Sequence, residues 1–246
     1  MTVFPGDSHI PQLRQLWKLA FGDTDAFLDV FFESAYSPER CRCVLEKDTV
    51  VAALYWFDCE CEGRKHAYLY AVATHPEHRG RGLCRQLMAD THVLLKEQGY
   101  DGILLVPQEE GLRRMYAAMG YRNGTAVTEH LCKAGKPAAL SAVDMETYAK
   151  LRRQYLPSGG VIQEGANLRF LGRYAKFYAG DDFVAVVSGS EGIELLGNAA
   201  KAPGVLGALG MDSGKFRTPG EELPFAMFLA LKRDVPVPKY FGFAFD

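Results

Sequence analysis

The sequence predicts an α/β (α+β) protein with a central mixed, mostly antiparallel sheet flanked by helices, followed by a smaller α/β domain. Three observations predict this fold. Residues 41–74 have the composition of consecutive strands joined by short turns, and residues 82–132 alternate between helical and strand-like patterns. A polar segment with glycine and proline, 133–137, then precedes a weaker set of elements in similar order. We therefore expect two domains, at 1–135 and 136–246.

Two helices are expected before the first of these strands. Ser8 or Asp7 can cap a helix whose apolar residues recur at helical spacing, and Gly22 can end it. Asp23 or Thr24 can start a second helix with its apolar residues along one side. Both helices should flank the sheet.

The order of the remaining elements follows from turn residues and from β-branched or aromatic composition. In the first half the expected strands are 41–46, 49–60, 66–74, 102–106 and 126–132, and the last of them closes that half. The expected helices there are 82–98 and 111–119, each followed by a glycine. In the second half the expected helices are 142–155 and 166–178, and the expected strands are 183–188, 193–197, 224–231 and 240–245.

Composition gives no sign of several classes of partner. The 246 residues carry a formal net charge of −2 with a pI near 6.3, which gives no reason to expect a nucleic-acid partner. No apolar run approaches the ~18 residues of a membrane span. The N-terminus lacks the basic segment and apolar run of a signal peptide. We expect no membrane partner and a cytoplasmic location, and the sequence leaves the oligomeric state open.

The six cysteines raise the alternative of a zinc site, because four of them form two Cys-x-Cys pairs. With a two-residue turn between the first two strands, Cys43 would pair near Ala52 and Cys41 near Leu54. Cys59 would then lie roughly 16 Å further along the strand at ~3.3 Å per residue, and one ion with ~2.3 Å bonds to sulfur cannot span that distance. We expect reduced, structural cysteines and no metal.

The segment 67–84 has the features of an anion-binding turn between a strand and a helix. Gly80 and Gly82 allow successive backbone N–H groups to converge, and a helix that begins near Gly82 adds unpaired N–H donors and its positive dipole end. Arg79 and Arg81 add charge suited to a diphosphate. The segment is not a Walker loop, since no Gly-Lys-Ser/Thr follows, and it lacks the third glycine of a dinucleotide fingerprint.

At this segment the sequence resembles the GNAT superfamily of N-acetyltransferases. Residues 79–84, Arg-Gly-Arg-Gly-Leu-Cys, are similar to the Arg/Gln-x-x-Gly-x-Gly/Ala signature that binds the pyrophosphate of acetyl-CoA in that superfamily. Residues 115–121 resemble its Tyr-x-x-x-Gly-Phe segment. The resemblance therefore implies that Tyr116 protonates the leaving thiolate, and that acetyl-CoA is the co-substrate. Cys84 stands where Gly or Ala is usual, and Glu109 stands where an asparagine often holds the coenzyme arm.

The resemblance also implies a set of cofactor contacts and an architecture. The implied cofactor-binding residues are Ala71, Val72, Ala73, Arg79, Gly80, Arg81, Gly82, Leu83 and Cys84. Among these, the backbone N–H of Val72 or of a neighbour is the implied donor to the thioester oxygen. The bipartite plan is similar to the enhanced-intracellular-survival branch of the superfamily, which implies that the second domain is a degenerate GNAT-like domain.

The general base is not evident from the residues. The strand before the glycine turn carries no carboxylate, unlike that of many GNAT proteins. Glu60 and His66, with Asp58 and Glu62, fall near the substrate-side end of the strands and are candidate bases. In bipartite relatives the chain's own terminal carboxylate can reach the active site, which makes Asp246 a further candidate.

Two functions from different classes fit these residues. The first is an N-acyltransferase that moves an acetyl group from acetyl-CoA to a primary amine of a small molecule or peptide. The alternative is a catalytically silent acyl-CoA-binding or regulatory module, which would keep the anion-binding turn without a base. The identity of the amine and the size of the acyl group do not follow from the sequence.

Overall fold

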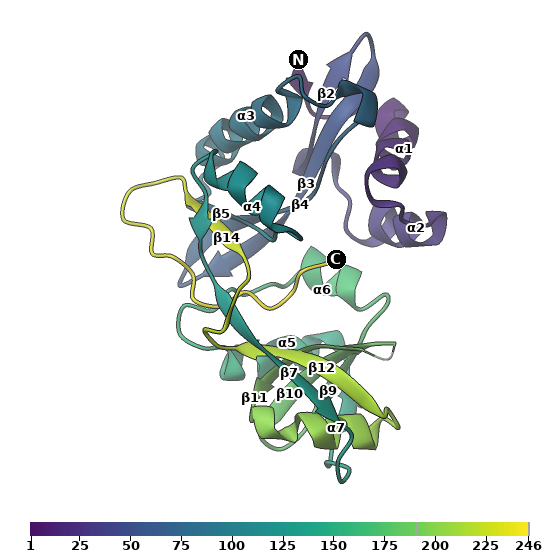
Figure 1. The fold of residues 1–246 in the computed structure, drawn as a ribbon, viewed down its shortest axis with the longest axis vertical. Helices are drawn as coiled ribbons and strands as arrows, with labels where there is room; N and C mark the ends of the chain where they lie inside the picture. The colour runs from purple at the N-terminus through teal and green to yellow at the C-terminus, as the bar shows by residue number, and fades with distance from the viewer. Residues whose placement is uncertain (190, 246) are drawn as a thin grey trace.

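The computed structural model describes residues 1–189 and 191–245 and contains two seven-stranded sheets, one above the other in Figure 1. The first sheet has the strand order β1-β2-β3-β4-β5-β14-β6, and the second has the order β13-β7-β12-β11-β10-β9-β8. We call each sheet with its covering helices the first and the second unit. The expected α/β architecture with mostly antiparallel sheets flanked by helices is confirmed.

The first unit places helices on both faces of its sheet (Figure 1). Its strands are β1 (Thr2–Val3), β2 (Cys41–Glu46), β3 (Thr49–Cys61), β4 (Arg64–Thr74), β5 (Gly102–Leu105), β6 (Arg122–Asn123) and β14 (Met227–Ala230). Its helices are α1 (Ile10–Phe21), α2 (Asp25–Ser34), α3 (Leu83–Glu97) and α4 (Glu110–Ala117), with short 3₁₀ turns at Asp7–His9, Pro38–Arg40 and Pro76–His78. Trp17 of α1 packs on Tyr70 of β4, whereas Leu87 of α3 shares the opposite core with Leu69. Successive side chains of β4 point to opposite faces of the sheet and therefore pack into two separate cores.

The ends of α1 and α2 follow the sequence signals. Gly22 adopts φ +76° as the left-handed C-cap of α1, and its N–H donates to the Lys18 carbonyl. Thr24 caps α2, since its side chain accepts a hydrogen bond from the N–H of Phe27. Asp23 lies in the short loop between the two caps.

The antiparallel meander of β2, β3 and β4 is confirmed, but its register differs by one residue from the expectation. Cys43 pairs with Ala53 and Cys41 with Tyr55, because a β-bulge after Val44 inserts an extra residue into β3. All six cysteines are free thiols. Across residues 1–189 and 191–245 no group of His, Cys, Asp and Glu side chains is arranged to hold a metal ion.

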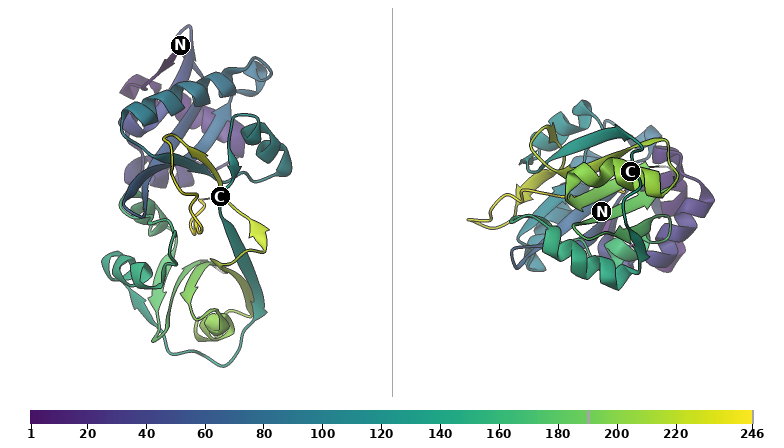
Figure 2. Two further views of the ribbon diagram at one scale, coloured as in Figure 1. Left: turned by 90° about the vertical axis from the view of Figure 1, so that its left-hand side faces the viewer. Right: turned by 90° about the horizontal axis from the view of Figure 1, so that it is seen from below.

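The two units exchange strands. The expected strand 126–132 exists as β7 (Ala126–Lys133), but it belongs to the second sheet, between β12 and β13, and β14 from the C-terminal half lies between β5 and β6 (Figures 1 and 2). The expectation that 126–132 closes the first half is therefore wrong. The backbone N–H groups of Gly124 and Thr125 both donate to the Ala226 carbonyl, so the exchanging segments are joined where they cross.

Side-chain patterns explain this exchange. Met227 and Phe228 are consecutive and both buried, as a strand covered on both faces requires. In β7, by contrast, buried Val127 and 81 % exposed Leu131 reflect a strand that is only partly covered. Because strands from both sides of residue 135 contribute to each sheet, the domain division at 135/136 stays a prediction.

In the second unit, several helix and strand boundaries differ from the expected ones. Its elements are β8 (Ser141–Val143), α5 (Met145–Tyr155), α6 (Ala166–Leu171), β9 (Lys176–Ala179), β10 (Phe183–Ser188), β11 (Glu191–Gly197), a 3₁₀ turn (Ala199–Lys201), α7 (Ala202–Ala208), β12 (Ser213–Pro219) and β13 (Leu223–Pro224). The helix expected at 142–155 begins later, because Asp144 caps α5 by accepting from the N–H of Thr147. The helix expected at 166–178 stops at Gly172, and the chain after it pairs with β10 as β9.

The C-terminal segment returns from the second unit to the first. The strand expected at 224–231 is divided into β13 and β14, and 240–245 is not a strand but an extended segment with one bridge, between Gly160 and Tyr240. Its aromatic residues join the first unit's core, where Phe245 contacts Phe57 with ring centroids 4.9 Å apart. None of the helices built from the described residues has the length and apolarity needed to cross a membrane.

Candidate active site

Strands β4 and β5 begin as a parallel pair and then separate. They pair from His66–Gly102 to Tyr68–Leu104, and no pairing of the two described strands follows. Just beyond, β4 contains a bulge in which Ala71 and Val72 together face Leu54 of β3, and Ala71 has a φ of +48°. The bulge turns β4 away from β5, and a cleft opens between the two strand ends.

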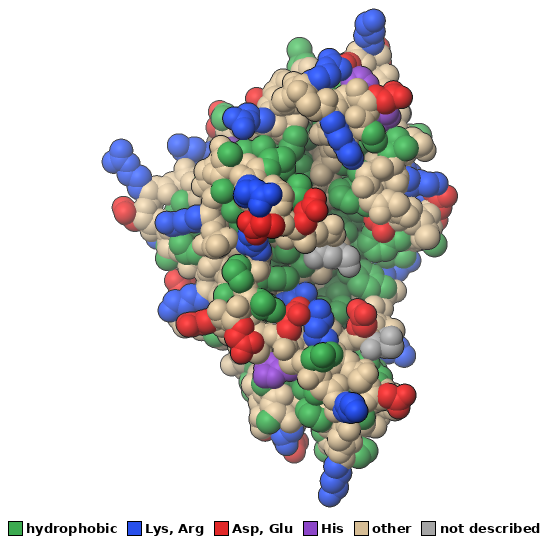
Figure 3. All heavy atoms as spheres, viewed as in Figure 1, with side chains coloured by type: hydrophobic (Ala, Val, Ile, Leu, Met, Phe, Trp, Pro, Cys, Tyr) green, Lys and Arg blue, Asp and Glu red, His purple; other side chains and the backbone are tan. Residues whose placement is uncertain are grey.

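A cavity of about 470 Å³ occupies this cleft. It is lined by Trp17, Ala20, Phe21, Asp23, Phe27, Tyr68, Leu69, Tyr70, Ala71, Val72, Leu105, Val106, Pro107, Gln108, Leu112, Tyr116 and Phe245. These residues come from α1, the α1–α2 loop, α2, β4, the end of β5, α4 and the C-terminal segment. The surface view shows hydrophobic side chains around the hollow in the middle of this face (Figure 3).

The glycine turn before α3 is open to solvent. Gly80 and Gly82 have φ values of +75° and +78°, in the left-handed region that favours glycine, and no described atom lies within 4 Å of a Cβ built at either. Gly82 is the N-cap of α3, and no described side chain caps the helix there. The first N–H groups of a 15-residue helix therefore remain available to an anion.

The two arginines of the turn have different surroundings. Arg81 forms an ion pair with Glu46 of β2 through hydrogen bonds of 2.7 and 3.1 Å, and these bonds hold the pKa of Glu46 below its usual value. Arg79 donates from Nε to the Thr74 carbonyl at 3.3 Å and has no acidic partner in the described chain. Arg79 is thus the cation of the turn whose charge is not neutralised by an ion pair.

Tyr116 projects from α4 into the cavity and is 6 % exposed. Its ring packs against Tyr121 with centroids 5.8 Å apart. Burial raises the pKa of Tyr116 above its ordinary value, so the phenol stays protonated at neutral pH. A protonated hydroxyl at the cavity wall can act as a proton donor.

The splayed strands, the glycine turn and the tyrosine on α4 all lie within residues 5–124. Residues 5–124 match the family model described as the acetyltransferase (GNAT) domain. Residues 5–124 are a GNAT domain. A search of curated protein sequences found no match for the chain.

Solved structures resemble the whole chain and not only its GNAT domain. A GCN5-related N-acetyltransferase from Kribbella flavida superposes with a TM-score of 0.73 at 17 % identity, over 94 % of this chain and 70 % of that one. Eis1 from Mycobacterium abscessus gives 0.68 at 12 % identity, over 94 % and 74 %. A tandem GNAT protein from the clavulanic acid biosynthesis pathway gives 0.57 at 14 % identity, over 96 % and 99 %. At these identities the likeness shows a shared two-unit fold.

The cofactor residues expected from the sequence occupy two places in the GNAT domain. Ala71 and Val72 line the cavity at the bulge, followed by Ala73, which is 6 % exposed. The rest lie in the glycine turn and the first turn of α3, where Leu83 is buried and Cys84 is half-buried. Burial raises the pKa of the Cys84 thiol. Glu109 is the N-cap of α4, and its side chain forms no capping hydrogen bond.

Among the described residues, none of the expected bases lines the cavity. His66 is buried beside Phe228 of β14, with ring centroids 5.7 Å apart, and burial lowers its pKa. Glu60 is exposed, and its backbone bridges to Ile162 of the second unit. Asp58 forms an ion pair with Arg40. Asp246 lies outside the described residues, so the roles of Glu60, His66 and Asp246 as bases stay predictions.

Sequence reasoning assigned Asp23 only a capping role and missed its place in the site. Asp23 is the only charged residue among the described residues that line the cavity. Its Oδ2 accepts a hydrogen bond of 2.8 Å from Nε1 of Trp17, which is 2 % exposed. The sequence signal was its position directly after the C-cap Gly22, where a polar residue can reach back to the preceding helix.

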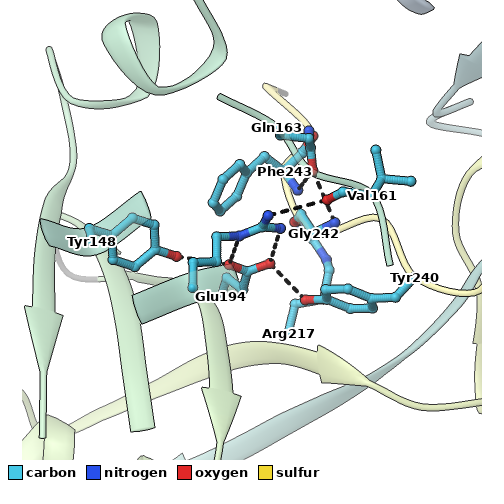
Figure 4. A network of polar contacts seen from close by, with 9 residues as sticks. Tyr148, Val161, Gln163, Glu194, Arg217, Tyr240, Gly242 and Phe243 are labelled. Atoms are coloured by element: carbon cyan, nitrogen blue, oxygen red, sulfur yellow. Dashed lines mark hydrogen bonds and ion pairs between the residues drawn. The ribbon is translucent and has the colours of Figure 1, made fainter. Parts of the chain in front are cut away.

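The second unit holds the C-terminal segment that brings Phe245 to the cavity. Buried Glu194 pairs with Arg152 through bonds of 2.8 and 2.9 Å and also accepts hydrogen bonds from the hydroxyls of Tyr148 and Tyr240 (Figure 4). A Cβ at Gly242 would lie 1.7 Å from Glu194, so the segment passes where only glycine fits.

Gln163 fixes the next residues of the same segment. It accepts from the N–H groups of Gly242 and Phe243, and its Nε2 donates to the Phe243 carbonyl at 2.8 Å (Figure 4). Two residues further on, Phe245 is 3 % exposed in the cavity wall. The second unit thus completes the site of the first.

Proposed function

We propose that this protein is an N-acyltransferase that transfers an acetyl group from acetyl-CoA to a primary amine. The observation that carries the proposal is a cavity lined both by the bulge at Ala71 and Val72 and by Tyr116. The family assignment of residues 5–124 supports acyl transfer in general. We further propose that the acyl group is acetyl, that the amine belongs to a small molecule or peptide, and that these residues have the roles given below.

The residues around the cavity fit acetyl-CoA as co-substrate, which would supply the activated acyl group. The open turn at Gly80 and Gly82 and the N-terminus of α3 offer N–H donors for the diphosphate, and Arg79 adds a positive charge. Ala71 and Val72 lie where a thioester could enter between the splayed strands, and a backbone N–H there would stabilise the developing oxyanion.

The chemistry starts with the protonation state of the amine. An alkylamine with a pKa near 10.4 is ~3.4 units from neutrality at pH 7, which costs about 4.6 kcal/mol. After the ammonium loses a proton to solvent, its nitrogen lone pair attacks the thioester carbonyl. The nitrogen of the resulting tetrahedral intermediate loses a second proton to solvent, the C–S bond breaks as the carbonyl re-forms, and the sulfur takes a proton from Tyr116. One of the two protons released by nitrogen returns through solvent to Tyr116. The products are the N-acetyl amide, free coenzyme A and one proton.

The deciding experiment measures thiol release from acetyl-CoA with a panel of primary amines, together with calorimetric binding of acetyl-CoA. The proposal expects amine-dependent thiol release and a loss of kcat of at least about 100-fold in Tyr116→Phe. Binding of acetyl-CoA should stay within about twofold. Tyr155→Phe is the matched control, because that hydroxyl donates to the Asp181 carbonyl in the second unit, away from the cavity lining.

One outcome would favour the alternative function. Tight binding of acetyl-CoA without thiol release for any amine indicates the catalytically silent acyl-CoA-binding module. This alternative function is supported by the cavity lining, which does not include Glu60 or His66 among the described residues. Absence of binding as well would overturn both.

A further inference from the structure

We propose that the acceptor is a primary monoamine carried on an aromatic or similar apolar group, and that Asp23 binds its ammonium. This inference rests on the proposed function and adds the substrate class. It concerns the part of the cavity formed by α1, the α1–α2 loop, α2, the residues of β4 before the bulge and the C-terminal segment, which we call the acceptor pocket. The acyl group would enter from the opposite part, formed by the bulge of β4, the end of β5 and α4.

Aromatic rings form most of the acceptor pocket. The rings belong to Trp17, Phe21, Phe27, Tyr68, Tyr70 and Phe245. They contact one another: Trp17 lies 5.4 Å from Tyr70, and Tyr70 lies 5.8 Å from Phe245, centroid to centroid. Such a wall binds flat apolar groups by burial and edge-to-face contact.

Among the described residues, the pocket carries one negative charge without a protein counter-ion. Neighbouring acids at the same corner are matched, since Asp25 pairs with Lys18 at 2.9 Å and Asp29 with Arg14 at 2.6 Å. Asp23 instead lines the cavity and accepts only the Trp17 hydrogen bond, with no ion pair to any cation of the described chain. A half-buried carboxylate beside rings is complemented by an ammonium brought by the ligand.

The same arrangement rejects other classes of amine. An amino acid would place its own carboxylate in a pocket whose only charged side chain, among the described residues, is Asp23. A polyamine would place a second ammonium against apolar rings, where desolvation is unfavourable. The whole cavity measures about 470 Å³ and must also admit the acyl arm, so the acceptor is compact.

A structural role for Asp23 can be separated from ammonium binding. Asp23→Asn keeps an oxygen that accepts from Trp17 Nε1 but removes the charge. If Asp23 only oriented Trp17, this variant would behave as the wild type. Asp25→Asn is the matched control, because Asp25 is exposed, belongs to the next helix and does not line the cavity.

The test compares three amines in the thiol-release assay: phenethylamine, phenylalanine, which adds a carboxylate, and putrescine, which replaces the ring with a second ammonium. We expect phenethylamine to give the highest kcat/KM. Asp23→Asn should raise the KM for phenethylamine by about 10- to 100-fold, as loss of a charged hydrogen bond does. The KM for acetyl-CoA should not change, discrimination against phenylalanine should shrink, and Asp25→Asn should match the wild type.

The outcomes distinguish this inference from the proposed function. If phenylalanine or the diamine is the better acceptor, or if Asp23→Asn leaves the KM for phenethylamine unchanged, the inference is overturned while acyl transfer stands. If no amine releases thiol, calorimetric titration of phenethylamine into the protein saturated with coenzyme A decides. Binding that weakens in Asp23→Asn supports the ligand class without catalysis, and no binding overturns it.

Discussion

Tyr240 donates a hydrogen bond of 2.9 Å to Glu194, 46 residues earlier in the chain, and so ties the C-terminal segment to the buried ion pair of the second unit. Five residues later, Phe245 forms part of the cavity wall of the GNAT domain. A network of the second unit therefore shapes the site of the first.

Removing the charge of Glu194 should destabilise the protein strongly. Glu194→Gln leaves Arg152, which is 3 % exposed, without its counter-ion, and such a change costs about 3–5 kcal/mol of unfolding free energy. Urea denaturation followed by circular dichroism measures it. The matched control is Glu164→Gln, which breaks the surface pair with Arg153 and should cost at most about 1 kcal/mol. Equal effects of the two substitutions would contradict the prediction.

Shortening Phe245 should enlarge the acceptor pocket. In Phe245→Ala the removed ring opens space beside Tyr70, so we expect the preference between small and bulky amines to shift toward bulky ones by about tenfold in kcat/KM. The KM for acetyl-CoA should stay unchanged. Phe4→Ala removes an exposed ring outside the cavity lining and serves as control. An unchanged preference would mean that Phe245 does not limit the acceptor.

A side chain at Gly82 should weaken acetyl-CoA binding. Gly82→Ala forces a φ of +78° on a residue with Cβ, which costs about 1 kcal/mol, and places a methyl group where the diphosphate must approach the backbone. We expect at least about a tenfold rise in the Kd of acetyl-CoA by calorimetry.

Gly99→Ala provides the control for Gly82→Ala. Gly99 follows the other end of α3, has a φ of +86°, and likewise has no described atom within 4 Å of a built Cβ. The two substitutions should therefore lower the melting temperature to a similar extent. A similar loss of acetyl-CoA affinity in both would show that strain, and not the ligand, accounts for the effect.

Acid should destabilise the protein through His92. Burial lowers the pKa of His92 from 6.5 to about 4, and the ring shares a contact of 2.8 Å with the Tyr121 hydroxyl. Because the unfolded chain takes up the proton more readily, the stability contributed by neutral His92 is complete above pH 6.5 and is lost as the pH falls toward 4. Melting temperatures of wild type and His92→Asn between pH 7 and pH 4 should therefore converge. Parallel curves would contradict the assignment.

Local signals were enough to predict the elements around the site. Strand composition indicated the β2–β4 meander, and the caps at Gly22, Thr24 and Gly82 indicated the helix boundaries, because each depends on residues adjacent in sequence. The segment that contains Tyr116 was found by its family spacing. These predictions placed the glycine turn and the tyrosine on the correct elements.

Contacts between distant residues decided the rest. Whether β7 or β14 enters the first sheet depends on which strand has both faces covered, and only packing against β5 and β6 reveals this. The N–H of Phe245 approaches the Tyr68 hydroxyl at 3.4 Å across 177 residues, and no local pattern encodes that proximity. The sequence predicted only a helix cap for Asp23, whereas the tertiary structure places it in the cavity lining among aromatic rings. Residues close together in the sequence thus determined the glycine turn and the helix that carries Tyr116, which form the acetyl-CoA side of the site. The acceptor pocket depends on packing between residues that are far apart in the sequence, and only the tertiary structure reveals it.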